Sequence, residues 1–213
     1  MHLVFPRLYA IMAAALLRTS ELAFAGMLAE SGVELIQYRN KLASSRSLFQ
    51  VSQSLVRFLN PLGAKYIVND RADVAMLAGA SGVHIGQQDL DVEQARAICG
   101  PTRWVGVSTH SLEQVRQADT TSANYIAVGP IFATSTKANP HAVVGVDFIR
   151  QARAMTKKPL VAIGGITLER ASEVFRAGAD SVAVARDLLC ASDPGSRARA
   201  FLAVAAQIRS EAQ

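Results

Sequence analysis

Two short apolar runs of the chain each lead into a polar tip that carries a carboxylate. The run at residues 66–68 is followed by Asp70, and the run at residues 83–85 is followed by Asp89. If the two runs are neighbouring parallel strands, their ends bring both carboxylates to one rim. Carboxylate oxygens suit Mg²⁺, which usually also binds the phosphates of a substrate. The pair therefore predicts a magnesium site beside a phosphorylated ligand.

Each of these carboxylates also has a simpler interpretation. Asp70 could cap the helix that follows it, because Asp is a favoured N-cap residue, and Asp89 could be a cap or part of a turn. For each aspartate considered alone, the cap or turn role and the metal role have about equal weight. The joint occurrence of both carboxylates beside Arg39 and Lys41 favours a metal site. His84 is expected to be a hydrogen-bonded core residue, because a hard cation prefers oxygen ligands.

Short apolar strands that alternate with amphipathic helices make up the rest of the chain. Most of the strands read as continuous apolar runs, as expected for parallel strands that are covered on both faces. The eight predicted strands cover residues 8–12, 34–38, 65–68, 82–85, 104–107, 125–128, 160–163 and 181–185. Gly32, Gly79 and Gly178 stand where helices are expected to end. With no compositional break in sight, the pattern predicts an α/β fold, a single (β/α)8 (TIM) barrel domain over residues 1–213.

A barrel of this kind carries its chemistry on the rim formed by the carboxyl ends of the strands. Polar residues do follow the predicted strands, among them Gln37, Arg39, Lys41, Asn69, Asp70, Asp89, Ser108, His110, Thr134 and Lys137. His110 could start a helix or act as a base, and the helix start is favoured. The longest stretch without periodicity, residues 129–145, is expected to be a functional loop.

Several segments, in this order, resemble those of the thiamine-phosphate synthase family. They are residues 37–41 (QYRNK), 69–71 (NDR), 82–89 (GVHIGQQD), 106–108 (GVS), 129–137 (GPIFATSTK) and 162–166 (AIGGI). The resemblance covers nearly the whole chain. It implies a transferase that joins hydroxymethylpyrimidine diphosphate to a thiazole phosphate and releases pyrophosphate, in a Mg²⁺-assisted dissociative displacement.

The resemblance also implies roles for individual residues. It places Asp70 and Asp89 on Mg²⁺, and it makes Arg39, Lys41, Ser108 and Lys137 catalytic. The pyrimidine diphosphate is expected to contact Gln37, Tyr38, Arg39, Asn40, Lys41, Asn69, Ser108 and Lys137. The thiazole phosphate is expected to contact Thr134, Ser135, Thr136, Gly165, Ala185 and Arg186. Because the thiazole nitrogen is itself the nucleophile, the reaction needs no nucleophilic side chain, and Ser108 is expected to donate a hydrogen bond.

The chain departs from the family in two places. Ala185-Arg186 follows the last strand, where the family commonly has an aliphatic residue and then serine, and Met12-Ala13 stands where Thr-Asp is frequent. Arg186 is expected to be neutral or to add a phosphate contact, and the effect of Met12-Ala13 is left open. A related thiazole tautomerase and a catalytically silent barrel that binds thiazole phosphate remain as alternatives. Asp89 and the loop at residues 134–137 favour the synthase.

Composition excludes some other classes of function. The net charge is +5, but aromatic residues are only 6% of the chain, so a nucleic-acid partner is not expected. The arginines at 197, 199 and 209 predict a solvated basic helix face. Cys99 and Cys190 have no metal spacing and are expected to be reduced core residues, which indicates a cytoplasmic protein without a disulfide. The apolar run at residues 8–17 is too short to span a membrane and is expected to hold the first strand. Small molecules are the expected partners, and a homodimer is left open.

Overall fold

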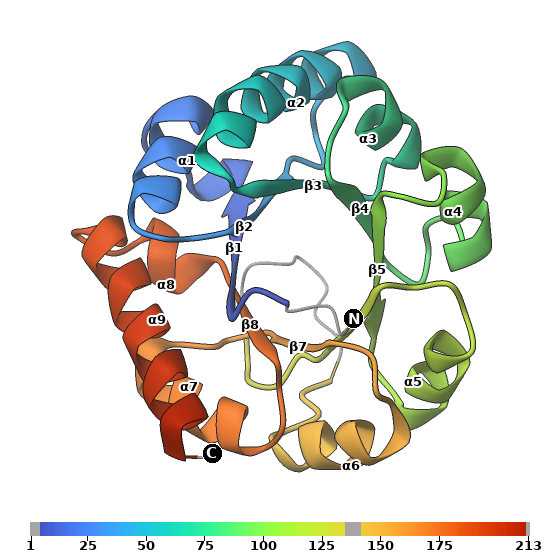
Figure 1. The fold of residues 1–213 in the computed structure, drawn as a ribbon, viewed down its shortest axis with the longest axis vertical. Helices are drawn as coiled ribbons and strands as arrows, with labels where there is room; N and C mark the ends of the chain where they lie inside the picture. The colour runs from blue at the N-terminus through green and yellow to red at the C-terminus, as the bar shows by residue number, and fades with distance from the viewer. Residues whose placement is uncertain (1–4, 135–141, 212–213) are drawn as a thin grey trace.

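Parallel strands close into a barrel in the computed structural model, which describes residues 5–134 and 142–211 (Figure 1). Each strand of these described residues pairs with the next along the chain, and β1 closes the ring by pairing with β8. The strands are β1 (Leu8–Ala13), β2 (Leu35–Arg39), β3 (Lys65–Asn69), β4 (Gly82–Ile85), β5 (Trp104–Thr109), β6 (Tyr125–Val128), β7 (Leu160–Ile163) and β8 (Ser181–Val184). The predicted (β/α)8 barrel is therefore confirmed.

Helices form the outer ring, and they follow the strands in turn (Figure 1). They are α1 (Glu21–Glu30), α2 (Ser45–Leu59), α3 (Ala72–Ala78), α4 (Val92–Cys99), α5 (Leu112–Asp119), α6 (Asp147–Met155), α7 (Leu168–Arg176), α8 (Arg186–Leu189) and α9 (Pro194–Glu211), with short 3₁₀ turns η1 (Ala14–Leu16) and η2 (Asn60–Leu62). Asp91 begins α4 with a capping box to Gln94. Gly32, Gly79 and Gly178 have φ values of +88°, +73° and +106°, as the predicted helix ends require.

Alternate strand residues face opposite sides of the barrel wall. One set of apolar side chains, which includes Leu8, Ile36 and Val68, packs between the strands and the helices. The other set fills the interior and includes Phe5, Tyr9 and Tyr125. The interior is thus a packed core, and in a barrel of this kind the ligand site is expected above it, at the carboxyl ends of the strands.

The strand bounds differ from the predicted ones mainly at the rim. β2, β3 and β5 continue through Arg39, Asn69 and Thr109, because these polar residues still pair with the neighbouring strand. Apolar runs could not mark those ends, since the strands become polar where they meet the site. None of the helices in the described part of the chain is long and apolar enough to cross a membrane.

The C-terminal helix corrects one expectation. Arg197 of α9 is not simply solvated, because its guanidinium pairs with Asp187 at 2.9 Å and with Glu169 at 2.8 Å. Arg199 donates a hydrogen bond to the Ser31 hydroxyl. These arginines join α9 to α7, α8 and the end of α1, so they contribute to packing as well as to surface charge.

Candidate active site

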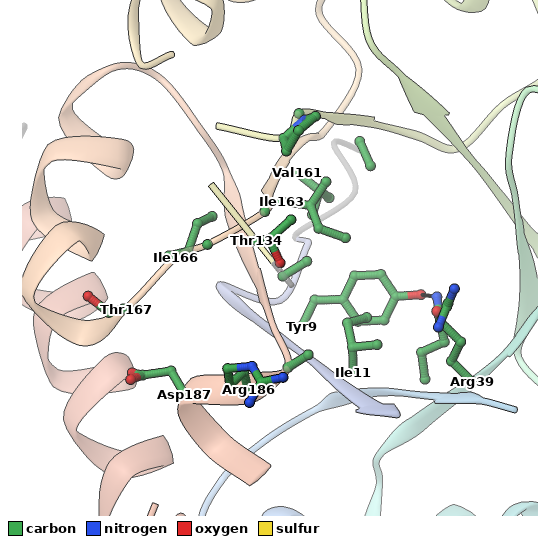
Figure 2. Close-up of a pocket in the computed structure, with 18 of the residues that line it drawn as sticks. Tyr9, Ile11, Arg39, Thr134, Val161, Ile163, Ile166, Thr167, Arg186 and Asp187 are labelled. Carbon is green, nitrogen blue, oxygen red and sulfur yellow. Dashed lines mark hydrogen bonds between the residues drawn. The ribbon is translucent and has the colours of Figure 1, made fainter. Parts of the chain in front are cut away.

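A cavity of about 840 Å³ opens at the carboxyl ends of the strands, where the barrel fold predicts a site. Figure 2 shows part of its wall, with Arg39 at one side, Arg186 and Asp187 at another, and the Tyr9 ring on the floor. A volume of this size accommodates a ligand of two small rings with phosphate groups. The charged residues therefore share one pocket with an apolar floor.

Asp70 holds an unusual backbone conformation at the rim. Its φ is +64°, and it is the one non-glycine residue with a positive φ in the described segments. Its side chain forms an ion pair with Lys41 at 3.1 Å. Asp70 does not cap α3, because Arg71 is the N-cap residue and pairs with Asp73 instead. The structure thus excludes the capping role, and strained residues of this kind cluster at functional sites.

Asp89 lies beside Asp70 and closes the loop after β4. Its Oδ2 accepts a hydrogen bond from the Gly86 amide at 2.8 Å, so the turn interpretation holds, whereas Asp91 provides the cap of α4. Burial and the neighbouring Asp89 carboxylate raise the pKa of Asp70, while Lys41 opposes the rise. Two carboxylates that repel each other in this way favour a cation between them.

The carboxylates of Asp70 and Asp89 are too few to coordinate a metal ion without other ligands, but they suit a magnesium ion that is also bound by water and a substrate. Among residues 5–134 and 142–211, no group of three or more His, Cys, Asp or Glu side chains could hold a metal ion. Asp70 and Asp89 together supply two carboxylates. Mg²⁺ is often bound by one or two carboxylates, with waters and substrate phosphates completing the octahedron. The pair therefore fits an ion that arrives with a diphosphate.

Strand β2 sends alternate residues to the pocket. Gln37, Arg39 and Lys41 line it, and Asn69 joins them from the end of β3. Tyr38 and Asn40 do not: the Tyr38 hydroxyl donates to Glu21 of α1 at 3.0 Å, and the Asn40 amide donates to the Tyr38 hydroxyl at 3.1 Å. Tyr38, on the opposite strand face from Gln37 and Arg39, and Asn40, which bonds to it, are therefore not part of the pocket wall. Their contact with substrate stays a prediction.

Ser108 and His110 reach the pocket from the end of β5. Ser108 lies in the strand, 5% exposed, with its Oγ 2.8 Å from His84 Nε2. His110 does not start the helix, because Ser111 is the N-cap residue of α5. Instead His110 lines the pocket, where its Nδ1 donates to the Gly129 carbonyl at 2.5 Å. His84 is hydrogen-bonded and buried, as predicted.

The loops after β6 and β7 pack closely against each other. The amides of Ile131 and Phe132 donate to the carbonyls of Ile163 and Gly164 at 2.9 and 3.0 Å. Gly165 has a φ of +61°, and a Cβ on it would lie 2.3 Å from the Ala133 carbonyl oxygen. Thr134 and Gly165 line the pocket. Ser135, Thr136 and Lys137, which the sequence also assigns to substrate, lie outside the described residues.

The end of β8 completes the wall. Ala185 and Arg186 line the pocket, as the sequence predicts. The carboxylate of Asp187 accepts from the Leu168 amide at 3.0 Å and from Arg197, which fixes the start of α7 against α8. The exposed Arg186 guanidinium has no comparable anchor to a carboxylate in the described segments, so a phosphate could draw it in.

Sequence reasoning did not assign several residues that line this pocket. They are Tyr9, Thr167, Arg170, Asp187 and Arg197. Most follow β7 and β8, where the sequence motif is short and the lining residues come from the start of α7 and from α7, α8 and α9. For Tyr9 the signal was available: a tyrosine in an otherwise aliphatic strand needs a partner for its hydroxyl.

The two cysteines differ in environment, which corrects the expectation that both are core residues. Cys99 is buried, and desolvation raises the pKa of its thiol, whereas Cys190 is exposed at the pocket. We expect a maleimide to label Cys190 in the folded protein and Cys99 only after unfolding, because the thiolate is the reactive form. Mass spectrometry of the labelled peptides measures this, and rapid labelling of Cys99 under native conditions would contradict the packing of α4.

Comparisons with known proteins agree with this geometry. The family model described as thiamine monophosphate synthase matches residues 8–188. A protein of Koribacter versatilis named thiamine-phosphate synthase is 50% identical over 207 residues, which cover 95% of this chain and 97% of the relative. Another of that name, from Chloroflexus aurantiacus, is 41% identical over 204 residues, with coverages of 95% and 94%.

Solved structures give the same picture. A thiamine phosphate pyrophosphorylase from Pyrococcus furiosus superposes with a TM-score of 0.86 at 30% identity, covering 95% of this chain and 96% of that one. A 3-hexulose-6-phosphate synthase superposes with a TM-score of 0.68 at 20% identity, covering 94% and 99%, and shares the fold alone.

Proposed function

The chain belongs to the thiamine monophosphate synthase family of transferases, and we propose that it joins hydroxymethylpyrimidine diphosphate to a thiazole phosphate at the rim pocket. The thiazole nitrogen forms a bond to the pyrimidine methylene carbon, and the bond from that carbon to the diphosphate oxygen breaks. The products are thiamine phosphate and pyrophosphate. The single observation that carries the proposal is the meeting of Asp70, Asp89, Lys41 and Arg39 in one pocket.

The departing diphosphate needs cations around it, since negative charge grows on the leaving oxygen. We infer that Asp70 and Asp89 hold Mg²⁺, which when bound neutralises the charge of the diphosphate. Arg39 offers a planar fork for phosphate oxygens, and Lys41 offers a mobile point charge. Lys41 is already placed by its ion pair with Asp70, so the cationic side of the site is partly organised before substrate binds.

The pyrimidine methylene develops positive charge as the leaving group departs in a dissociative displacement. Water would trap that carbon, so the site must exclude water from it. The apolar side chain of Ile11 and the ring of Tyr9 line part of the pocket wall (Figure 2). From the family resemblance, Lys137 would add a charge to the diphosphate, and Thr134 to Thr136 would bind the thiazole phosphate. Gln37 and Asn69 offer amide groups that can hydrogen-bond to the pyrimidine or the diphosphate.

The test is an omission experiment with the purified chain. Pyrophosphate release is measured with both phosphorylated precursors and Mg²⁺, and then with each of the three left out in turn. We expect release only in the complete mixture. Conversion of the thiazole phosphate alone, without any release of pyrophosphate, would favour a tautomerase. Binding of thiazole phosphate without any release would favour a silent binding barrel.

A variant at Arg186 tests the departure at the end of β8. The exposed guanidinium lines the thiazole side of the pocket, so Arg186→Ser should weaken thiazole phosphate binding about threefold to tenfold, as expected for loss of a solvated phosphate contact. The KM for the pyrimidine diphosphate should change little. A markedly lower KM for thiazole phosphate in the variant would show that a serine hydroxyl serves the site better.

A further inference from the structure

Five polar side chains form a continuous hydrogen-bonded chain across the barrel interior, beneath the pocket. Gln37 Nε2 donates to the Tyr9 hydroxyl at 2.6 Å, which lies 3.0 Å from the Tyr125 hydroxyl. Tyr125 in turn lies 3.0 Å from His84 Nδ1, and His84 Nε2 lies 2.8 Å from Ser108 Oγ. All five are at most 7% exposed. The two ends, Gln37 and Ser108, both line the pocket, and the family resemblance assigns both to the pyrimidine diphosphate.

Gly106 leaves the space that the Tyr125 ring of this hydrogen-bonded series occupies. A Cβ on Gly106 would lie 1.9 Å from the Tyr125 ring, so the ring occupies the space that a side chain of β5 would fill. The Tyr125 ring stacks on His84 with centroids 5.5 Å apart and meets Tyr9 edge-on at 5.9 Å. Phe5 packs beneath Tyr125 at 4.9 Å. The three polar rings are thus held by packing as well as by hydrogen bonds.

The number of available protons determines which group donates in each of these hydrogen bonds. Tyr9 accepts from the Gln37 amide, so its own proton must go to Tyr125, the other partner of its hydroxyl in the described residues. The proton of Tyr125 then goes to Nδ1 of His84, and His84 donates from Nε2 to Ser108. The reverse direction at Tyr125 would leave the Tyr9 proton buried without an acceptor, which is costly. Burial raises the pKa of both phenols, so both keep their protons.

We propose that Tyr9, Tyr125 and His84 are positioning residues, which hold His84 as the neutral Nε2–H tautomer and so turn the Ser108 hydroxyl proton into the pocket. Ser108 is thereby fixed as a donor, and it selects an acceptor atom on the pyrimidine diphosphate. The inference about the ligand rests on the proposed function. The assignment of donor and acceptor in each hydrogen bond, from Gln37 to Ser108, rests on the contacts between the five side chains.

The tautomer can be measured without any activity. In protein with ¹⁵N-labelled histidine, we expect the His84 signals to show a pyridine-like Nδ1 and a pyrrole-like Nε2, and His84→Gln identifies which of the four histidines gives them. A pyrrole-like Nδ1 would overturn the proposal, because the chain would then run from Ser108 towards a Gln37 that presents its amide oxygen to Tyr9.

A pair of tyrosine variants tests the effect on substrate. Tyr125→Phe removes one oxygen from the chain, so we expect mixed His84 tautomers and a KM for the pyrimidine diphosphate raised roughly tenfold, with the KM for thiazole phosphate within about twofold. The matched control is Tyr66→Phe, because Tyr66 is equally buried but bonds Ser52 on the helix side of β3. It should change neither the tautomer nor either KM.

The outcomes separate this inference from the proposed function. If Tyr125→Phe behaves as Tyr66→Phe does, or raises both KM values equally, the positioning role is wrong. If Tyr125→Phe does not fold, the tautomer of the unaltered protein still decides the direction of the chain. If the unaltered protein releases no pyrophosphate while His84 shows the expected tautomer, the proposed function fails and the hydrogen-bonded chain stands.

Discussion

Asp89→Ala is expected to lower Mg²⁺-dependent pyrophosphate release by roughly 10²–10³-fold, the scale on which loss of one preorganised electrostatic contact slows an enzyme. The reason is that the variant would keep only one carboxylate, Asp70, of the pair that we infer to hold the metal. The rate is measured over a range of Mg²⁺ concentrations, and we expect half-saturation to move to higher Mg²⁺. Because Asp89 is exposed and makes one local bond, to the Gly86 amide, its loss should cost only about 1 kcal/mol of stability.

Asp91 offers a matched control two residues along the chain. Its carboxylate caps α4 and is equally exposed, but it is not part of the pocket wall. Asp91→Ala should lower the free energy of unfolding by about 1 kcal/mol through loss of the cap and leave turnover unchanged. Full activity of Asp89→Ala, or equal losses in the two variants, would contradict the metal assignment.

The strand order and the rim could be predicted because both depend on local patterns. Continuous apolar runs mark parallel strands, and in a barrel every strand end reaches the same rim, so Asp70 and Asp89 could be brought together without knowledge of the packing. The same logic brings Gln37 and Arg39 to the pocket wall, because they are two residues apart on one strand face. Tyr38 and Asn40 belong to the same motif, but the Tyr38 hydroxyl bonds Glu21 of α1 and the Asn40 amide bonds Tyr38, and such contacts cannot be read from the motif.

Other features depend on contacts between distant parts of the chain, and no local pattern reports them. Arg197 pairs with Asp187 and Glu169 only because α9 folds back over α7 and α8. His110 was expected at a helix start, but its bond to the Gly129 carbonyl depends on how β5 and β6 end beside each other. The positive φ of Asp70 is likewise invisible in the sequence, since Asp is a common cap residue.

The contact between the loops after β6 and β7 leads to the second large effect, which is expected for Gly165→Ala. The residue has a φ of +61°, and a Cβ on it would meet the Ala133 carbonyl oxygen at 2.3 Å and Phe132 Cβ at 2.9 Å. The variant must move the segment that leads directly to Thr134. We expect the KM for thiazole phosphate to rise by about tenfold or more, with a smaller change for the pyrimidine diphosphate, in steady-state assays that vary each substrate.

Gly63 separates the effect of this contact from that of backbone strain. Its φ is +75°, but a Cβ on it would meet nothing within 4 Å, so Gly63→Ala should cost only the left-handed penalty of about 1–2 kcal/mol and leave both KM values unchanged. Gly165→Ala carries the same penalty and a further cost of about 1–3 kcal/mol from overpacking. If both variants lose the same stability and Gly165→Ala binds thiazole phosphate normally, the loop contact does not shape the site. A selective loss at Gly165 would instead show that the close approach of the two loops, which only glycine permits, sets the thiazole side of the pocket.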